Sequence, residues 1–176
     1  MDANEQEPEL RARTWYVLHV KPRTEKKTFE RLRQLNVFRY LPLFTKSRRV
    51  QRRKVVTTVP MFPGYVFTRL NPDERREVLK TQLVVRTIEV MQPRRMIHQL
   101  RQIAHAGRLP AELKPVTDFT VGEHVRVKSG PLMGMDGFVR RRGNSTTLVL
   151  ALEILGQAVE TSVSASDLEK TDSPGT

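Results

Sequence analysis

The 176-residue sequence predicts an α+β fold in two parts: a domain in which helices cover a mainly antiparallel sheet, then a small β-barrel. Strand and helix patterns alternate in the first part, and only short strand patterns follow. The charge is divided in the same way. Residues 1–108 carry 24 Lys and Arg against 10 Asp and Glu, whereas residues 109–176 carry 7 against 9. A basic first part is typical of a domain that works near nucleic acid or an acidic surface, although such charge also serves solubility.

The first elements follow from local composition. Aromatic and β-branched residues predict a buried strand over residues 15–20, which Pro22 ends because proline has no backbone N–H. Apolar residues at helical spacing then predict a helix over residues 24–35, with Thr24 as its N-cap.

A long hairpin is expected next. Residues 37–44 have an extended pattern, and residues 55–59 form an evident strand. Between them, residues 46–54 contain six basic side chains and no acidic one. The sequence therefore predicts two strands joined by a basic tip.

The stretch Met61-Phe62-Pro63-Gly64-Tyr65-Val66-Phe67 predicts a Pro-Gly turn that leads into a strand. Side chains alternate along a strand, so Tyr65 and Phe67 share one face. Asn71 and Pro72 predict the N-cap and first residue of a short helix. A strand over residues 83–90 follows, and then a helix from Pro93 whose apolar face carries Met96, Ile97, Leu100 and Ile103.

The remainder predicts a linker and a small all-β module. Residues 107–119 hold two prolines and little periodicity, and about five short strands follow over residues 121–170. Residues 125–137, Val-Arg-Val-Lys-Ser-Gly-Pro-Leu-Met-Gly-Met-Asp-Gly, predict a strand and a glycine-rich turn. We expect a tail at 1–13, a first domain at 14–106, the linker at 107–119 and the barrel at 120–170.

These motifs together resemble the NusG family of transcription elongation factors. Trp15-Tyr16 in the first strand, the Phe-Pro-Gly-Tyr run and the Gly-Pro-x-x-Gly-x-x-Gly turn occur in the family's order, and the resemblance covers residues 14–170. It implies an N-terminal NGN-type sandwich of antiparallel sheet and helices, followed by a KOW β-barrel of the SH3-like type.

The resemblance also implies an elongation and antitermination factor that binds RNA polymerase, suppresses pausing and recruits a partner through its KOW domain. The polymerase-binding patch would be an exposed aromatic cluster that grips a helical hairpin of the clamp. Its residues would be Tyr65, Phe67, Val90, Ile97 and Leu100. Burial in the core is the alternative for each of them.

A second implied surface binds nucleic acid, either the non-template DNA strand or nascent RNA. The matching basic residues are Lys21 and Arg23 beside the first helix, with Arg48, Arg49, Arg52 and Arg53 at the hairpin tip. The same charges also fit solvated surfaces, and both interpretations stay open.

In the barrel, Leu132 and Met133 match the loop through which the family recruits a ribosomal protein or a termination factor. Leu132 replaces an aromatic residue of the general factors. The stretch from Pro93 to Leu100 is more similar to the specialised RfaH branch, which indicates a specialised paralogue, whereas Gly64 is typical of the general factors. Glycines in the barrel disfavour the helical alternative known from that branch, so we expect a permanent barrel, although residues 148–155 fit either strand or helix.

Other classes of protein are disfavoured. The chain has no Cys, its four His are scattered, and it lacks phosphate-loop and serine-elbow motifs, so we expect neither an enzyme nor a metal or cofactor. We also expect a cytoplasmic monomer without membrane contact. The main alternative is an RNA-binding ribosomal or ribosome-assembly protein with a KOW domain.

Overall fold

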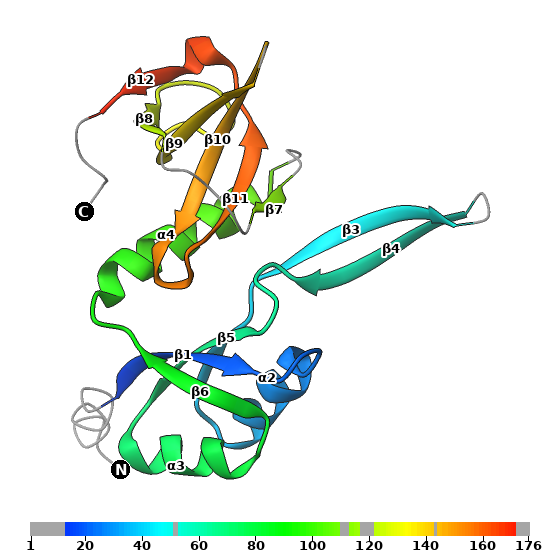
Figure 1. Cartoon of the computed structure of the whole chain (residues 1–176), viewed down its shortest axis with the longest axis vertical. Coiled ribbons are helices and arrows are strands. Elements are labelled where there is room, and N and C mark those ends of the chain that lie inside the picture. Colours follow the sequence, from blue (N-terminus) through cyan, green and yellow to red (C-terminus); the bar gives the residue numbers. More distant parts are fainter. Residues whose placement is uncertain (1–12, 51–52, 110–112, 117–121, 143, 172–176) are drawn as a thin grey trace, which may run out of the picture. The chain divides into compact units, whose positions relative to one another are not determined.

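A computed structural model describes residues 13–50, 53–109, 113–116, 122–142 and 144–171. The chain divides into two compact units, the first ending at Met91 and the second beginning at Gln92. Figure 1 shows the elements of both units.

The first unit is an antiparallel four-stranded sheet with two helices and a separate hairpin. The sheet has the order β2-β5-β1-β6, and β3 pairs with β4 along its whole length. The sequence predicts three strands between the two helices, and the structure has four, because the extended stretch expected at 37–44 divides into β2 and the start of β3. The predicted hairpin is present, but its strands run into the expected basic tip, to Val50 and from Arg53. The elements are β1 (Thr14–Val20), α2 (Glu25–Gln34), β2 (Phe38–Tyr40), β3 (Leu43–Val50), β4 (Arg53–Pro60), β5 (Tyr65–Leu70), α3 (Pro72–Lys80) and β6 (Val84–Glu89).

Both helices of this unit cover the same face of the sheet. Leu32 of α2 and Val78 of α3 belong to one buried cluster with alternate strand residues, namely Tyr16, Leu18, Val20, Val66, Leu70 and Val84, and with Val37. Because strand side chains alternate, the odd-numbered residues of β1 and β5 point to the opposite face. That second face carries the candidate site.

The Pro63-Gly64 turn sets the start of β5. Gly64 has a φ of +85°, and the N–H of Tyr65 donates to the carbonyl three residues earlier at 3.3 Å, as in a type II turn. The N–H of Gly64 donates to Oε1 of the buried Glu25 at 2.7 Å, and its carbonyl accepts from the N–H of Val20 at 2.8 Å. The turn is thus fixed to both α2 and β1.

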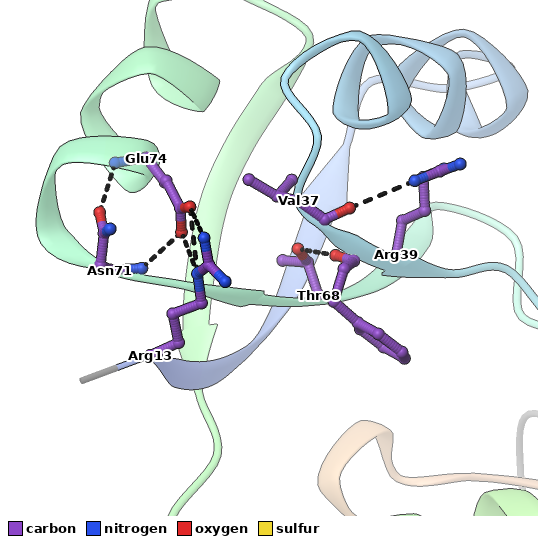
Figure 2. A network of polar contacts seen from close by, with 7 residues as sticks. Arg13, Val37, Arg39, Thr68, Asn71 and Glu74 are labelled. Carbon is purple, nitrogen blue, oxygen red and sulfur yellow. Dashed lines mark hydrogen bonds and ion pairs between the residues drawn. The ribbon is translucent and has the colours of Figure 1, made fainter. Parts of the chain in front are cut away.

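The start of α3 is as predicted, with Asn71 at the N-cap and Pro72 at the first position. Oδ1 of Asn71 accepts from the N–H of Glu74 at 2.8 Å, and the Glu74 carboxylate accepts from the N–H of Asn71 at 2.9 Å. Arg13 donates to the same carboxylate at distances of 2.5 to 3.1 Å, as Figure 2 shows. One carboxylate therefore joins the beginning of β1 to the beginning of α3.

Thr24 stands at the N-cap position of α2, but the prediction that its side chain caps the helix is wrong. Its hydroxyl donates to the carbonyl of Lys21 at 2.7 Å. A capping side chain requires an extended backbone, whereas Thr24 has φ −107° and ψ 7°. The hydroxyl tightens the turn before the helix instead.

The second unit is a helix and a six-stranded antiparallel sheet of order β12-β8-β9-β10-β11-β7. All five strands expected between residues 121 and 170 are present. The elements are α4 (Pro93–Ala106), β7 (Lys114–Val116), β8 (Glu123–Val127), β9 (Asp136–Arg142), β10 (Ser145–Leu152), β11 (Gln157–Ser162) and β12 (Leu168–Lys170), with short 3-10 turns η1 (Glu153–Leu155) and η2 (Ala165–Asp167).

The central strand β10 is buried on both faces. Every residue from Leu148 to Leu152 is buried, and α4 lies against β10 within this unit. A strand covered on both sides has a continuous apolar run rather than an alternating one, which is why its pattern also fits a helix. The structure has a strand to Leu152 and a 3-10 turn after it.

The division of the chain differs from the expected one in two places. Within the expected linker, Lys114–Val116 pairs with β11 as an edge strand. The helix α4 groups with the second unit rather than the first.

One polar side of α4 is hydrogen-bonded to the second sheet. Oε1 of Gln102 accepts from the N–H of Asp136 at 2.8 Å, and Oε1 of Gln99 accepts from the N–H of Glu153 at 3.2 Å. Arg95 forms an ion pair with Glu153 at 2.6 Å. These contacts to the ends of β9 and β10 account for the grouping.

Candidate functional site

The face of the first sheet opposite α2 and α3 is rich in aromatic residues. Strand register places its side chains in three rows across the sheet. The rows are Phe38–Arg69–Trp15, Tyr40–Phe67–Val17–Ile88 and Tyr65–His19–Arg86. We call these ten residues the aromatic face.

Rings within each row contact one another. Trp15 and Phe38 meet edge to face with centroids 5.0 Å apart, and the Arg69 guanidinium lies 5.8 Å from the Trp15 ring centroid. Tyr65 stacks on His19 with centroids 5.2 Å apart. Such contacts hold large apolar side chains in fixed positions, as a binding surface requires.

Exposure varies across the aromatic face. Phe38 is 48% exposed, and Trp15 and Tyr65 are partly exposed, whereas Phe67 is fully buried. The hydroxyl of Thr68 donates to the Phe38 carbonyl at 2.5 Å and fastens the edge strand that carries this ring (Figure 2). The exposed part of the face is therefore centred on β1 and β2 as well as on β5.

The five residues expected to bind polymerase have different environments. Tyr65 and Phe67 share a face as predicted, but the expectation that both are exposed is wrong for Phe67 because the side chain packs inward beside Tyr40. Val90 follows β6, donates its N–H to the Trp15 carbonyl at 2.9 Å and is buried. The other two lie on α4 of the second unit, Leu100 buried and Ile97 partly exposed.

Sequence reasoning missed several members of the aromatic face, above all Trp15, Phe38 and Tyr40. The missing information is the strand order, which places β2 beside β5 and β5 beside β1. A period-2 match between the aromatic residues of these three strands was the available signal.

The basic residues before α2 are placed where ligands have access. Lys21 and Arg23 are both exposed. Arg23 has a φ of +63° in the turn that closes with the N–H of Thr24 donating to the Lys21 carbonyl. A left-handed conformation costs a non-glycine residue about 1 kcal/mol or more, and such strain is concentrated at functional sites.

The hairpin tip is described in part. Arg53 is exposed, Arg48 and Arg49 are described as backbone of β3, and Arg52 lies outside the described residues. Near the base of the hairpin, Nζ of Lys26 donates to the carbonyl of Thr58 at 2.8 Å, which ties β4 to α2.

In the second unit the glycine-rich turn separates the two expected contact residues. Leu132 is buried, with 5% of its surface exposed, whereas Met133 is 69% exposed. The turn bonds that hold Met133 outward include its N–H to the Gly130 carbonyl at 3.1 Å. Of these two residues, Met133 is the one that offers apolar surface to a partner.

The described residues contain no group of three or more His, Asp or Glu arranged to hold a metal ion. None of the helices in this part of the chain is long and apolar enough to cross a membrane.

Comparison with known proteins gives a consistent set of relatives. A family model described as transcription termination factor nusG matches residues 13–104. The transcription termination/antitermination protein NusG of Borreliella burgdorferi is 25% identical over 188 residues, which span 90% of this chain and 99% of the relative.

Two solved structures are also similar. A structure described as domain interaction in Thermotoga maritima NusG is 21% identical, with a TM-score of 0.49, and covers 91% of this chain and 98% of its own. The MjSpt4:Spt5 complex is 13% identical, with a TM-score of 0.30, and covers 92% and 99%.

Proposed function

The chain belongs to the NusG family of transcription termination and antitermination factors, and we propose that it binds RNA polymerase through the aromatic face of its first unit. Members of this family are transcription factors rather than enzymes. The observation that carries the proposal is the aromatic face itself. It places partly exposed rings on a sheet surface whose opposite side is closed by two helices.

The physical reason is that large rings held in place by their neighbours bind with little loss of conformational entropy. Phe38 and Trp15 form one such pair, and Tyr65 stacked on His19 forms another. Arg69 and Arg86 lie in the outer rows and suit a partner segment with acidic residues around an apolar tip. Phe67 is buried beside Tyr40, and the N–H of Val90 donates to the Trp15 carbonyl, so both are part of the frame of this face. Ile97 and Leu100 lie on α4 of the second unit, and their assignment to polymerase rests on the family resemblance alone.

The role that follows is suppression of pausing, because a factor bound across the clamp stabilises its closed state without chemistry of its own. Lys21, Arg23 and the basic hairpin then contact nucleic acid near the polymerase, and Met133 of the second unit contacts a recruited protein. Phosphate contacts position the factor, whereas apolar contacts supply most of the affinity for protein.

Co-purification with polymerase tests this proposal. We expect Phe38→Ala and Tyr65→Ala together to weaken binding by about 30-fold or more, since one hot-spot aromatic contributes about 2 kcal/mol. Leu79→Ala is the matched control, because Leu79 is 40% exposed on α3 over the opposite face. Undiminished binding by the double variant, or co-purification with ribosomal subunits in place of polymerase, would reject the proposal in favour of the ribosomal alternative.

A further inference from the structure

We propose that Glu25 is a positioning residue of the aromatic face, because its carboxylate holds the Pro63-Gly64 turn and thereby keeps the ring of Tyr65 stacked on His19. The inference rests on the proposed function, since it concerns how the face that binds polymerase is kept in its binding shape. Glu25 is the first residue of α2, which covers the opposite face of the sheet, and only 7% of its surface is exposed. It therefore acts through the turn and not by contact with a partner.

Glu25 is a charged side chain in a buried place. Removing a carboxylate from water is costly unless hydrogen bonds or favourable electrostatics compensate. Its position in the first turn of α2 is favourable, because a helix N-terminus attracts negative charge. Oε1 of Glu25 accepts the N–H of Gly64 at 2.7 Å, which is a short, charge-assisted hydrogen bond. A buried acid that binds a backbone N–H of this turn indicates that the position of the turn matters.

The turn depends on hydrogen bonds from outside it. Its closing bond, from the N–H of Tyr65 to the carbonyl of Phe62, is 3.3 Å long, whereas such bonds are usually about 2.9 to 3.0 Å. Both bonds that tie Gly64 to its surroundings are shorter, 2.7 Å to Glu25 and 2.8 Å from the N–H of Val20. Loss of the carboxylate would leave the turn with the bond from Val20 and the weak closing bond.

The ring of His19 shows what the turn positions. The register of β1 with β5 ends at the pair His19–Tyr65, whose rings stack with centroids 5.2 Å apart and planes 24° from parallel. A Cβ added at Gly64 would lie 3.6 Å from Cδ2 of His19, so the imidazole lies directly beside the turn. The buried Nδ1 of His19 has no hydrogen-bond partner among the described residues, so packing holds this side of the ring. A displaced turn would therefore move Tyr65 and disturb the ring on which it stacks.

A displaced ring weakens binding even when it stays on the surface. Side chains that are already fixed in the bound arrangement lose little conformational entropy on binding, whereas loose ones lose more. Glu25 should thus contribute to affinity for polymerase through the order of Tyr65. An amide oxygen at position 25 can still accept the N–H of Gly64, although a bond to a neutral group is weaker than one to a carboxylate.

The test measures the affinity of the full chain for RNA polymerase at a temperature where circular dichroism shows every variant to be folded. Glu25→Met keeps the length of the side chain but has no oxygen to accept the bond, and Glu25→Gln keeps one. Glu30→Ala is the matched control on α2, because Glu30 is exposed and forms a surface ion pair with Arg33 at 2.8 Å. Glu74→Ala is a second control, which loosens the start of α3 instead of the turn.

We expect Glu25→Met to weaken polymerase binding by about tenfold, which is less than the loss of a hot-spot ring, and Glu25→Gln by about threefold or less. Both control variants should stay within about twofold of the wild type. In a Tyr65→Ala background, Glu25→Met should cost about twofold or less, because a residue that acts through Tyr65 has little effect once the ring is absent.

NMR of the His19 ring protons gives a readout that does not depend on polymerase. The stacked ring of Tyr65 shifts these resonances, so Glu25→Met should move them towards their positions in Tyr65→Ala, whereas Glu30→Ala should leave them in place. Unmoved His19 resonances in Glu25→Met, an equal loss of affinity in Glu74→Ala, or a full tenfold loss in the Tyr65→Ala background would each overturn the proposal. If Tyr65→Ala binds polymerase as tightly as the wild type, the proposed function fails, and the His19 resonances then decide alone whether Glu25 positions the ring.

Discussion

Glu74 is the side chain whose replacement most directly tests how the first unit is held in shape. Glu74→Ala removes two interactions at once, the return bond of the capping box from the Asn71 N–H and the ion pair with Arg13. Loss of a cap costs about 1 kcal/mol. The pair is about four-fifths buried, with 22% and 18% of the two side chains exposed, so its charge-assisted bonds contribute about 1 to 2 kcal/mol after allowance for solvent screening.

We therefore expect Glu74→Ala to destabilise the unit by about 2 to 3 kcal/mol, which lowers Tm by about 10 to 20 °C for a unit of this size. Urea unfolding monitored by the fluorescence of Trp15 measures this, since Trp15 is the single tryptophan and lies two residues from Arg13. Glu74→Gln retains an acceptor for Asn71 and should cost about 1 kcal/mol.

Glu77→Gln on the same helix breaks an exposed pair with Lys80 and should leave the urea midpoint close to that of the wild type, because solvent screens such a pair. A double-mutant cycle between Arg13→Ala and Glu74→Gln isolates the ion pair. If Glu74→Ala unfolds at the same urea concentration as Glu77→Gln, the network does not stabilise the unit.

Three other predictions concern both units. Gly137→Ala should destabilise the second unit by more than about 1 kcal/mol in a thermal melt, because an added Cβ would lie 2.6 Å from a β10 carbonyl oxygen, and wild-type stability would contradict this. Replacing Lys21 and Arg23 together with Gln should reduce the slope of log K against log salt concentration for single-stranded DNA by about 1.4, since each phosphate contact contributes about 0.7. An unchanged slope would show that both side chains are only solvated. Leu132→Ala should cost about 2 to 5 kcal/mol of stability, whereas Met133→Ser should keep the fold and reduce capture of a partner by the second unit; the reverse pattern would reject the assignment.

Most elements of the first unit were predictable because each has a strong local signal. The Pro63-Gly64 pair specifies a turn, and Asn71 with Pro72 specifies the start of a helix. Alternation along β5 correctly placed Tyr65 and Phe67 on one face. These features depend on residues close together in the sequence.

What local patterns could not give is the neighbour of each strand. Phe38 contacts Trp15 only because β2 and β1 both flank β5, so the seven residues of the aromatic face that lie on other strands could not be found from the pattern of β5 alone. Strand β7 was missed for a related reason. Its three residues include Pro115 and gain regular structure only by pairing with β11.

Thr24 shows a different kind of error. Its residue type favours an N-cap, but a hydroxyl can bond to any nearby backbone group, and here the Lys21 carbonyl is the partner. Residue type alone does not decide which of these backbone groups the hydroxyl bonds. The backbone angles at Thr24, in the turn before the helix, decide it.

Site-specific photo-crosslinking tests the central claim most directly. A photoreactive phenylalanine analogue at Phe38 replaces an exposed ring on the aromatic face, and the same analogue at Leu79 serves as the control on α3. With elongation complexes, the account predicts irradiation to join the Phe38 variant to a polymerase subunit and to leave the Leu79 variant uncoupled. Crosslinking from Leu79 in preference to Phe38, or none from Phe38 in a complex that still contains the factor, would contradict it.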